Sequence, residues 1–476
     1  MSKALVIFFL GVLSLSSFAQ GGPCPVATST QTSTTPSRSG DLICLVPQVY
    51  GGGGLVGTDH GGPLDPTNAF GHTVHFRASS LAGFNPLNAE IGTQLSQLPF
   101  ASPASGFIFT FNPSLGVVSQ QVGNFGPILT ERAETVGRHK LFVGLSYQFF
   151  NFDQVDGVDL RSFNAVFTHE DESNLCNVPS PPPFLGCGSD GKPRFQHDII
   201  STQNRIDLKV HQITLVSTFG VTNRLDLSVA LPILNVRMSM FSSSNITSFE
   251  TTCCIHRFSP VNPDIPAHES FINTSKAIFF NDGSASGIGD VVFRGKFEAL
   301  KREKAGLAVG LDVRFPTGDE ENFLGSGTYG IRPFVVFSYT GRISPHASLG
   351  YQINGNSILA GDITQNLDAH LPNVITYSAG ADAGVTRRLS FSVDFLGQAL
   401  QNARKISSTT YTDSFVNVTQ PNITTTGATI NQASIAVGGK VNPLAKLLLT
   451  ANVLFRVNDA GLHSKPVPLV GVSYTF

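Results

Sequence analysis

Five charged residues recur in three neighbouring segments that otherwise alternate like apolar β-strands: Asp290, Arg294, Asp312, Arg314 and Arg332. Residues two apart on a strand point to the same side, so the charged side chains share one face of each predicted strand. If the three strands are neighbours, guanidinium and carboxylate groups gather on one surface. Two interpretations remain open: a charged patch that lines a passage or binds a ligand, and an internal network of ion pairs that satisfies buried charge.

The same two interpretations apply to an earlier segment in which four polar residues alternate: Arg205, Asp207, Lys209 and His211. His346 is expected to face the interior beside Ser348, because the two share one face of a strand. A Ser–His pair suggests nucleophilic catalysis only with an orienting acid and an oxyanion donor, and the sequence supplies neither. Asp59-His60 lies in a Gly-rich loop without a nucleophile nearby. We therefore predict no catalytic residue and no enzyme activity.

Six cysteines lie outside the strand-like segments: Cys24, Cys44, Cys176, Cys187, Cys253 and Cys254. Local spacing favours the pairs Cys24–Cys44 and Cys176–Cys187, whereas Cys253-Cys254 could bridge each other or pair elsewhere. His256 follows the last pair, but the spacing is poor for zinc. We predict neither a metal site nor a cofactor.

The elements that must position these residues are alternating segments that begin near residue 140. We count twelve, an even number that suits a transmembrane antiparallel up-and-down β-barrel. Each is near or above the roughly 9–11 residues that a tilted strand needs to cross a bilayer. The segments are 140–152, 203–219, 224–240, 287–300, 306–316, 330–340, 345–355, 373–384, 388–400, 430–441, 446–458 and 466–476. A barrel of fourteen strands that includes a hairpin at 106–121 is the main alternative.

The connections alternate between short and long, which is the known asymmetry of outer-membrane barrels. The long ones are 153–202, 241–286, 317–329, 356–372 and 401–429, with a shorter one at 459–465. Apolar faces are expected to meet lipid and charged faces the lumen. In 224–240 the apolar pattern changes parity near Pro232, and a Pro in a strand favours a β-bulge there.

The chain ends on an apolar alternating strand whose last outward residues are Tyr474 and Phe476. An exposed apolar edge is a liability in a soluble protein, but a barrel closes that edge against its first strand. We interpret this strand as the assembly signal that the barrel-assembly machinery recognises.

The N-terminus predicts export. Lys3 precedes a short apolar run, and small residues follow at Ser17-Phe18-Ala19, so residues 1–19 resemble a cleaved signal peptide. Only 13% of residues are charged and the net charge is -2, which gives no indication of nucleic-acid binding.

Residues 20–139 do not alternate like the barrel. Asn85-Pro86 suits a helix start, and a helical stripe follows that ends at Pro99: Leu87, Ile91, Leu95 and Leu98. Phe107, Phe109 and Phe111 then alternate. Two alternatives remain for this extension: an element that plugs or abuts the barrel of residues 140–476, and a periplasmic extension.

Four segments resemble the MetA-pathway of phenol degradation family of bacterial outer-membrane proteins: Gly220 to Pro232, Ser286 to Phe297, Phe315 to Asp319 and Pro333 to Tyr339. Gly-Ile-Gly-Asp and Pro-Thr-Gly-Asp are the most specific pieces. The resemblance implies an outer-membrane barrel that admits small, often aromatic, compounds.

The prediction is therefore a channel or transporter in the outer membrane of a Gram-negative bacterium. It would contact membrane lipid and pass a small, moderately hydrophobic solute. A structural or surface-binding barrel without transport is the alternative, and an outer-membrane hydrolase is a third class. Conductance in a bilayer separates the first class from the others.

Overall fold

The computed structural model describes most of the region from residue 124 onward and parts of the preceding extension. The described residues are 24, 40–50, 57–58, 77–99, 109–112, 117–120, 124–169, 176, 187–249, 257–258, 271–273, 275–363, 366–444 and 446–476. The predicted signal peptide, Asp59-His60 and the Cys253-Cys254 pair lie outside them.

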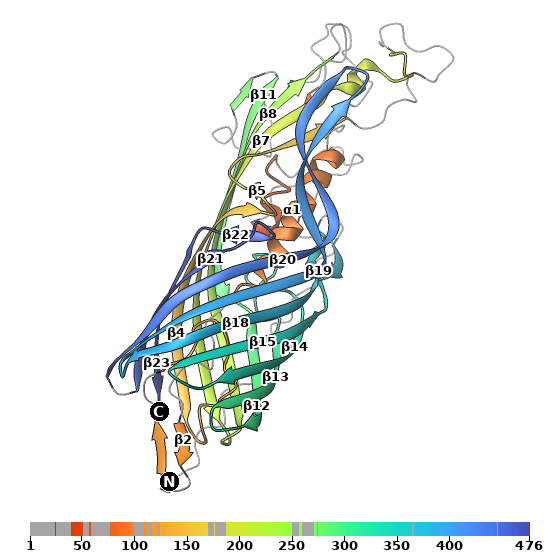
Figure 1. The fold of residues 1–476 in the computed structure, drawn as a ribbon. Coiled ribbons are helices and arrows are strands. Elements are labelled where there is room, and N and C mark those ends of the chain that lie inside the picture. The colour runs from red at the N-terminus through yellow and green to blue at the C-terminus, as the bar shows by residue number, and fades with distance from the viewer. Residues whose placement is uncertain are drawn as a thin grey trace.

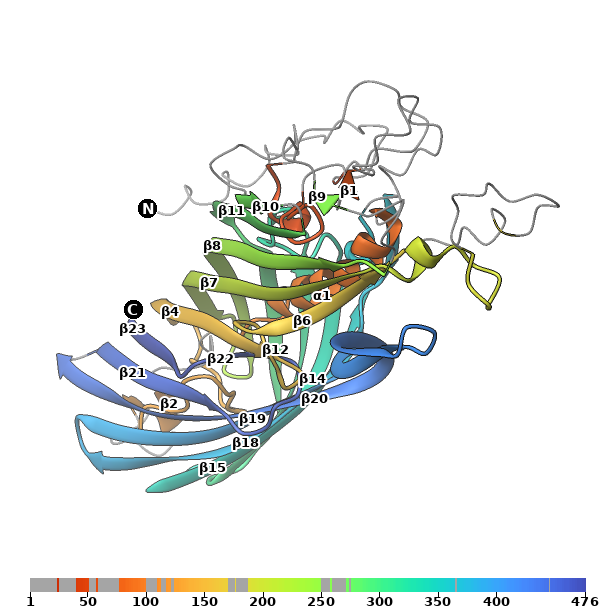
Figure 2. The same ribbon diagram turned by 90° about the horizontal axis from the view of Figure 1, so that it is seen from above.

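Twelve antiparallel strands form one closed barrel, which confirms the predicted fold (Figures 1 and 2). The ring closes where the last strand pairs with the first, from Leu469 opposite Gln148 to Thr475 opposite Phe142. Its strands are β4 (Leu141–Val155), β7 (Ile199–Gly220), β8 (Leu225–Thr247), β12 (Val291–Lys301), β13 (Ala305–Phe315), β14 (Gly330–Tyr339), β15 (Ile343–Asn354), β18 (Asn373–Thr386), β19 (Leu389–Asp413), β20 (Val418–Leu444), β21 (Leu447–Arg456) and β23 (Val467–Thr475).

Shorter strands extend this wall or stand apart from it. β11 (Lys276–Ile288) continues the line of β12 along β8. β5 (Val158–Asp159), β6 (Phe163–Thr168), β10 (Phe271–Asn273) and β22 (Leu462–Ser464) belong to the same sheet. Three separate pairs are β1 (Gly57–Thr58) with β9 (Arg257–Phe258), β16 (Asn356–Asp362) with β17 (Leu367–His370), and β2 (Phe109–Asn112) with β3 (Val117–Gln120). The fourteen-strand alternative is therefore wrong, because β2 and β3 pair only with each other.

A belt of exposed apolar side chains surrounds the barrel and identifies its lipid-facing surface. Leu227 on β8, Val309 on β13 and Phe391 on β19 are each about half exposed (52%, 46% and 52%). The alternating residues between them point inward and include buried charged groups. A water-soluble protein does not expose so continuous an apolar surface, so the predicted facing of these strands is confirmed.

The apolar side of two strands changes partway along their length. Near the short turns, β7 points Ile213, Leu215 and Phe219 outward. Further along the same strand, Ile206, Leu208 and Val210 point inward and are buried. β8 changes in the same way and pairs with β7 without a register shift. On its other edge the register shifts by one residue at Pro232, between the pair Ile233–Ile288 and the pair Ala230–Val292. The predicted irregularity is therefore present, but the extra residue lies in 289–291, opposite Pro232, and not in β8 itself, whose side chains keep alternating.

The strands also run further than the sequence pattern predicts. Parts of the expected loops 241–286 and 401–429 are strand, since β8 and β11 pair far beyond the belt and β19 and β20 form a hairpin up to Asp413 and Val418. Figure 1 shows these strands rising above the rest of the wall. We call this the long-loop end of the barrel, and the opposite end, where the hairpin turns are short, the short-turn end.

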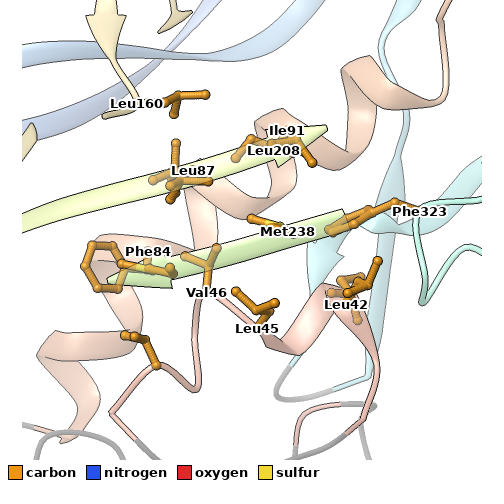
Figure 3. Close-up of a cluster of buried hydrophobic side chains, with 14 of the residues drawn as sticks. Leu42, Leu45, Val46, Phe84, Leu87, Ile91, Leu160, Leu208, Met238 and Phe323 are labelled. Carbon is orange, nitrogen blue, oxygen red and sulfur yellow. The ribbon is translucent and has the colours of Figure 1, made fainter. Parts of the chain in front are cut away.

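A helix and a short 3₁₀ turn fill the barrel between these tall strands. We call residues 40–50 and 84–99 the long-loop insert; it contains η1 (Leu42–Cys44) and the second half of α1 (Arg77–Leu95). Phe84, Leu87 and Ile91 pack with Leu208 and Met238 of the wall (Figure 3). The stripe predicted from sequence is therefore buried at Leu87, Ile91 and Leu95, and Leu98 packs partly buried against the same core.

The bounds of this helix differ from the prediction. It begins at Arg77 and continues through Pro86, although Pro lacks the N–H of one helical hydrogen bond. Phe84 and Leu87, which flank Pro86, are buried in the core and hold the helix in place there. Within the described residues, no helix is long and apolar enough to cross a membrane.

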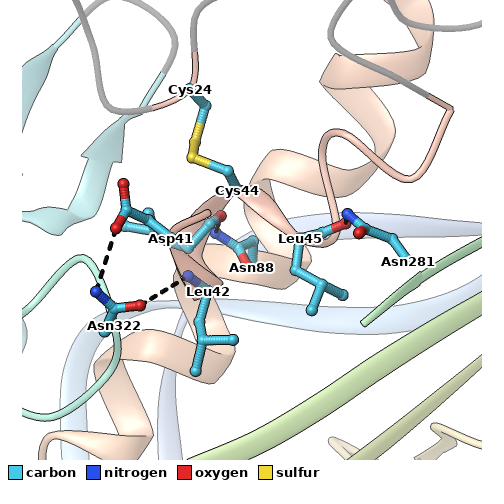
Figure 4. The surroundings of a disulfide bond; sticks show 9 residues. Cys24, Asp41, Leu42, Cys44, Leu45, Asn88, Asn281 and Asn322 are labelled. Carbon is cyan, nitrogen blue, oxygen red and sulfur yellow. Dashed lines mark hydrogen bonds between the residues drawn. A yellow bond between two sulfur atoms is a disulfide. The ribbon is translucent and has the colours of Figure 1, made fainter. Parts of the chain in front are cut away.

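Two disulfides hold the extension and a long loop. Cys24–Cys44 fixes the start of the insert, and Asn322 of the β13–β14 loop donates to Asp41 and accepts from the Leu42 N–H beside it (Figure 4). Cys176–Cys187 closes a segment between β6 and β7. Both are the pairs that local spacing favours.

Candidate functional site

A segment without regular structure lies inside the barrel at the short-turn end. We call residues 124–139 the strap; it immediately precedes β4. Most of its residues are buried although it contains no helix or strand. Buried backbone groups need partners, and the strap obtains them from side chains of the barrel wall.

Two buried ion pairs join the strap to two separate strands of the wall. Arg132 pairs with Asp382 of β18, and Glu131 pairs with Arg294 of β12. All four side chains are nearly inaccessible to solvent. Removing one partner of such a pair leaves an uncompensated buried charge, so these contacts fix the position of the strap.

Two lysines of the wall hold the strap by its backbone. Lys440 donates to the carbonyl oxygens of Phe125 and Pro127 at 3.0 and 2.6 Å. Lys296 donates to those of Arg132 and Glu134, both at 2.9 Å. Each ammonium group is buried. The carbonyl oxygens thus accept hydrogen bonds from the lysines in place of the backbone N–H groups of a helix or sheet.

Glu134 is bound by hydroxyl groups and not by a cation in direct contact. Thr340 and Ser338 donate to its carboxylate at 2.5 and 2.8 Å. Burial raises the pKa of Glu134, but the nearby Arg132 and the hydroxyl donors outweigh that effect and bring the pKa below its ordinary value. The carboxylate is therefore ionised where it holds the strap.

His346 belongs to the same set of contacts. Its Nε2 lies 2.8 Å from Asp394 Oδ1 and 2.8 Å from the Thr130 hydroxyl of the strap. A Cβ at Gly380 would overlap both His346 and Asp394, so the close approach requires glycine there. Ser348 contacts Ser378 at 2.7 Å and not His346, and no catalytic pair forms between them.

The charged residues predicted on three neighbouring strands come together inside the barrel. Asp312 accepts hydrogen bonds from Arg294, at 2.6 and 2.9 Å, and from Arg332. Both guanidinium groups lie over the ring of Phe334, 5.0 and 5.7 Å from its centroid. The arrangement combines an ion-pair network with a cation–π contact.

Asp290 and Arg314 form a second group that holds a loop. Asp290 accepts from the N–H groups of Gly318 and Ser326 at 3.2 and 2.9 Å. Thr317 accepts from the Val291 N–H and donates to the Gly289 carbonyl. The two most specific motifs, Gly-Ile-Gly-Asp and Pro-Thr-Gly-Asp, therefore bind each other and shape the wall.

A cavity of about 290 Å³ lies between the strap and the long-loop insert. One side carries Arg332, Arg294 and Phe334, and other parts of its wall carry Phe150 and Tyr377. Arg314 reaches the Ser96 carbonyl of the insert at 3.0 Å beside it. The cavity therefore offers aromatic surface together with charged hydrogen-bond donors. We call it the chamber.

Four polar residues of β7 that could have lined the lumen lie on its outer face instead: Arg205, Asp207, Lys209 and His211. Arg205 and Asp207 are on the outer face of β7, where they pair with each other at 2.9 Å, and the Arg205 side chain is 56% exposed. The prediction is wrong because it assumed that charged residues face inward along the whole strand. Beyond the belt, the outer face meets water and the inner face meets the apolar insert.

Some residues of the site were not identified from the sequence: Glu131, Arg132 and Lys440. The run Glu131-Arg132-Ala133-Glu134 directly before the first strand was an available signal. Within the described part of the chain, no group of three His, Cys, Asp or Glu side chains is arranged to hold a metal ion.

Comparison with known proteins agrees with the sequence motifs. Residues 201–402 match the family model described as "Putative MetA-pathway of phenol degradation". This confirms the resemblance seen in the sequence. The match runs from β7 into β19 and does not include the strap or the long-loop insert. No curated protein is significantly similar in sequence.

Solved structures of outer-membrane proteins are similar at low identity. The COG4313 outer-membrane channel from Pseudomonas putida F1 has a TM-score of 0.39 and 11% identity, over 72% of this chain and 98% of that one. The toluene transporter TodX of P. putida has a TM-score of 0.30 and 8% identity, over 71% and 90%. A FadL homologue from Pseudomonas aeruginosa has a TM-score of 0.30 and 10% identity, over 71% and 90%. Similarity at this level carries no inference about the solute.

Proposed function

We propose that this protein is a gated channel or transporter of the outer membrane for small, moderately hydrophobic solutes, including aromatic compounds. The observation that carries the proposal is the chamber, a cavity inside a lipid-facing barrel that is bounded by two separately anchored segments. A barrel filled only by its own inward side chains would be a structural protein. Here segments that precede the barrel in the chain occupy the lumen.

The chamber suggests the class of solute. Phe150, Phe334 and Tyr377 offer ring surfaces, and Arg332 offers a guanidinium group that is partly accessible. An aromatic ring with one hydrogen-bond acceptor suits this combination. The family match in residues 201–402 supports the same class.

Orientation follows from the barrel's asymmetry. In bacterial barrels the short turns are periplasmic and the long loops extracellular. We assign the short-turn end to the periplasm, with the C-terminal strand of Tyr474 and Phe476 recognised by the barrel-assembly machinery after a signal peptide at residues 1–19 is removed. In this orientation the strap closes the periplasmic side and the long-loop insert the outer side.

Bilayer conductance and vesicle uptake test the proposal. Deletion of residues 86–121 together with Arg132→Met should raise conductance while the barrel still assembles, because the deletion removes the described helix of the insert from Pro86 onward and the substitution releases the strap. Uptake of a phenol-sized aromatic solute should rise more than uptake of a sugar of similar mass.

Assembly is checked by the mobility of unheated protein in SDS. A well-assembled deletion with unchanged low conductance and no aromatic uptake would contradict transport. It would favour the alternative role, a barrel that acts as a structural or surface-binding protein.

A further inference from the structure

Two cations stand directly opposite each other on the outer face of the barrel. Lys209 of β7 pairs in register with Arg237 of β8, and both side chains are exposed. Like charges in directly opposite positions destabilise a strand pair. In the described part of the chain, neither has a carboxylate within ion-pair distance; Arg237 donates only to the Asn235 side chain at 3.1 Å.

A third cation lies beside them. Asn151 of β4 is the cross-strand neighbour of Lys209, and Arg161 donates to the Asn151 side chain at 3.2 Å. Within the described residues, no carboxylate lies within ion-pair distance of these three side chains. Asp159 accepts from the backbone N–H of Arg161 at 2.8 Å, and Asp153, two residues after Asn151, pairs with Arg456 at 3.6 Å. Asp207 is occupied by Arg205 at 2.9 Å, and Asp282 of β11 lies one row further toward the long-loop end. We call Arg161, Lys209 and Arg237 the outer cation row.

The outer cation row lies just beyond the apolar belt. Ile213 and Ile233 face each other as the last apolar pair, His211 and Asn235 follow, and Lys209 with Arg237 come next. His211 Nδ1 lies 2.8 Å from the Tyr147 hydroxyl, an amphipathic contact suited to a membrane interface. Counting from Phe219 near the short turn, Lys209 is ten residues along the strand, about what a tilted strand needs to cross the bilayer.

We propose that the outer cation row binds the phosphate groups of a phosphorylated glycolipid in the outer leaflet. The acyl chains of such a lipid would lie on the belt at Ile213 and Ile233. Its phosphates would then reach the height of Lys209 and Arg237, where clustered cations attract anionic headgroups. The lipid phosphate supplies the anion that the facing pair lacks. The proposal uses the orientation given above but not the transport activity.

The test measures lipid binding to the full-length protein in nanodiscs by native mass spectrometry. The probes are a bisphosphorylated acylated diglucosamine, the same lipid without phosphates, and inorganic phosphate alone. The variants are Lys209→Gln/Arg237→Gln and, as a matched control, Arg387→Gln/Arg388→Gln, which removes two exposed arginines at the short-turn end. Heat-modifiable migration in SDS confirms that each variant is folded.

The bisphosphorylated lipid should bind the wild type and the control equally and lose about thirtyfold in affinity for Lys209→Gln/Arg237→Gln, from about 1 kcal/mol per cation. The dephosphorylated lipid should bind all three proteins weakly and alike. Equal binding of the two lipids, or an equal loss in the control, would overturn the proposal. Saturation of the site by inorganic phosphate alone would show that the ligand is a free anion and not a lipid.

Discussion

At the scale of single residues, two buried acids of the N-terminal segments have pKa values shifted in opposite directions. The carboxylate of Glu134 in the strap has donors and a nearby cation, and its pKa lies below the ordinary value. Glu90 in α1 is buried next to Gln94 and not far from another acid, Asp156. Burial, with the charge of Asp156 added, raises the pKa of Glu90 well above its ordinary value.

This difference predicts how pH affects the long-loop insert. A raised pKa means that the packed position of the helix favours the protonated form of Glu90. The stabilisation of the insert by protonated Glu90 is therefore complete at low pH and is lost as the pH rises through the raised pKa. Protection of residues 84–95 in hydrogen exchange should therefore be greatest at low pH and fall as the pH rises above the ordinary carboxyl range, after correction for intrinsic exchange. Glu90→Gln should remove this fall.

The matched control is Glu303→Gln, an exposed acid in a short turn, which should leave the pH dependence of the helix unchanged. If Glu90→Gln and the wild type lose protection in parallel, Glu90 is not the group that titrates.

At the scale of elements, the strap depends on the barrel wall more than on itself. It has no internal helix or sheet, and its fixed points are the buried contacts of Glu131, Arg132 and Glu134 together with the lysine contacts to its carbonyls. A segment of this kind detaches when its contacts are removed, whereas the strands that surround it keep their own hydrogen bonds.

Arg132→Met should release the strap, because Asp382 would then be buried without its cation at a cost of about 3–5 kcal/mol. We expect faster hydrogen exchange in residues 124–139, and higher conductance when residues 86–121 are deleted as well. Arg132→Met/Asp382→Leu should recover most of the protection, since no unpaired charge remains. Arg138→Met, at the exposed end of the strap, should change little. A double variant as exchangeable as the single one would contradict this role for the pair.

The element scale also shows what the sequence could predict. Alternation identified all twelve barrel strands, because the residues that meet lipid repeat at every second position. Alternation gave the wrong facing for Arg205 and Asp207 of β7. These residues lie beyond the belt, where the outer face is polar because it meets water. The charged run of the strap was visible in the sequence, but its contacts could not be predicted, because partners such as Arg132 and Asp382 are 250 residues apart and follow no period.

At the scale of the whole molecule, the belt and the closed ring determine which substitutions the barrel tolerates. The belt on β8 runs from Leu225 to Ile233, and the outward residues after it are Asn235, Arg237 and Ser239. One strand therefore offers lipid-facing and water-facing positions on the same side of the backbone.

Val229→Arg should impair insertion much more than Ser239→Arg. Both positions point outward on β8, but Val229 lies near the middle of the belt, where an Arg costs about 2–4 kcal/mol, and Ser239 lies beyond it. The yield of heat-modifiable barrel in outer-membrane fractions measures the difference. Equal yields would mean that the lipid boundary is not at Ile233.

Closure of the ring gives a further prediction. The Phe476 N–H donates to the Leu141 carbonyl at 2.8 Å, and its ring contacts that of Tyr474 at the seam between β23 and β4. Deletion of Phe476 should slow assembly, seen as a delayed appearance of the compact form in unheated SDS gels. Phe476→Tyr keeps an aromatic terminus and should assemble at the normal rate; a delay as long as that of the deletion would contradict a role for the aromatic ring.

The change of apolar face along β7 and β8 also affects what antibodies and phages can reach. Loops are the usual extracellular parts of a bacterial barrel, and they vary in conformation. Here the outer faces of the strands themselves, with Gln203, Arg205 and Asp207 in a row, extend past the lipid while the sheet keeps their spacing fixed. In the orientation proposed above, the cell surface would present a rigid epitope made from a β-sheet, which an immune receptor could recognise without ordering a loop.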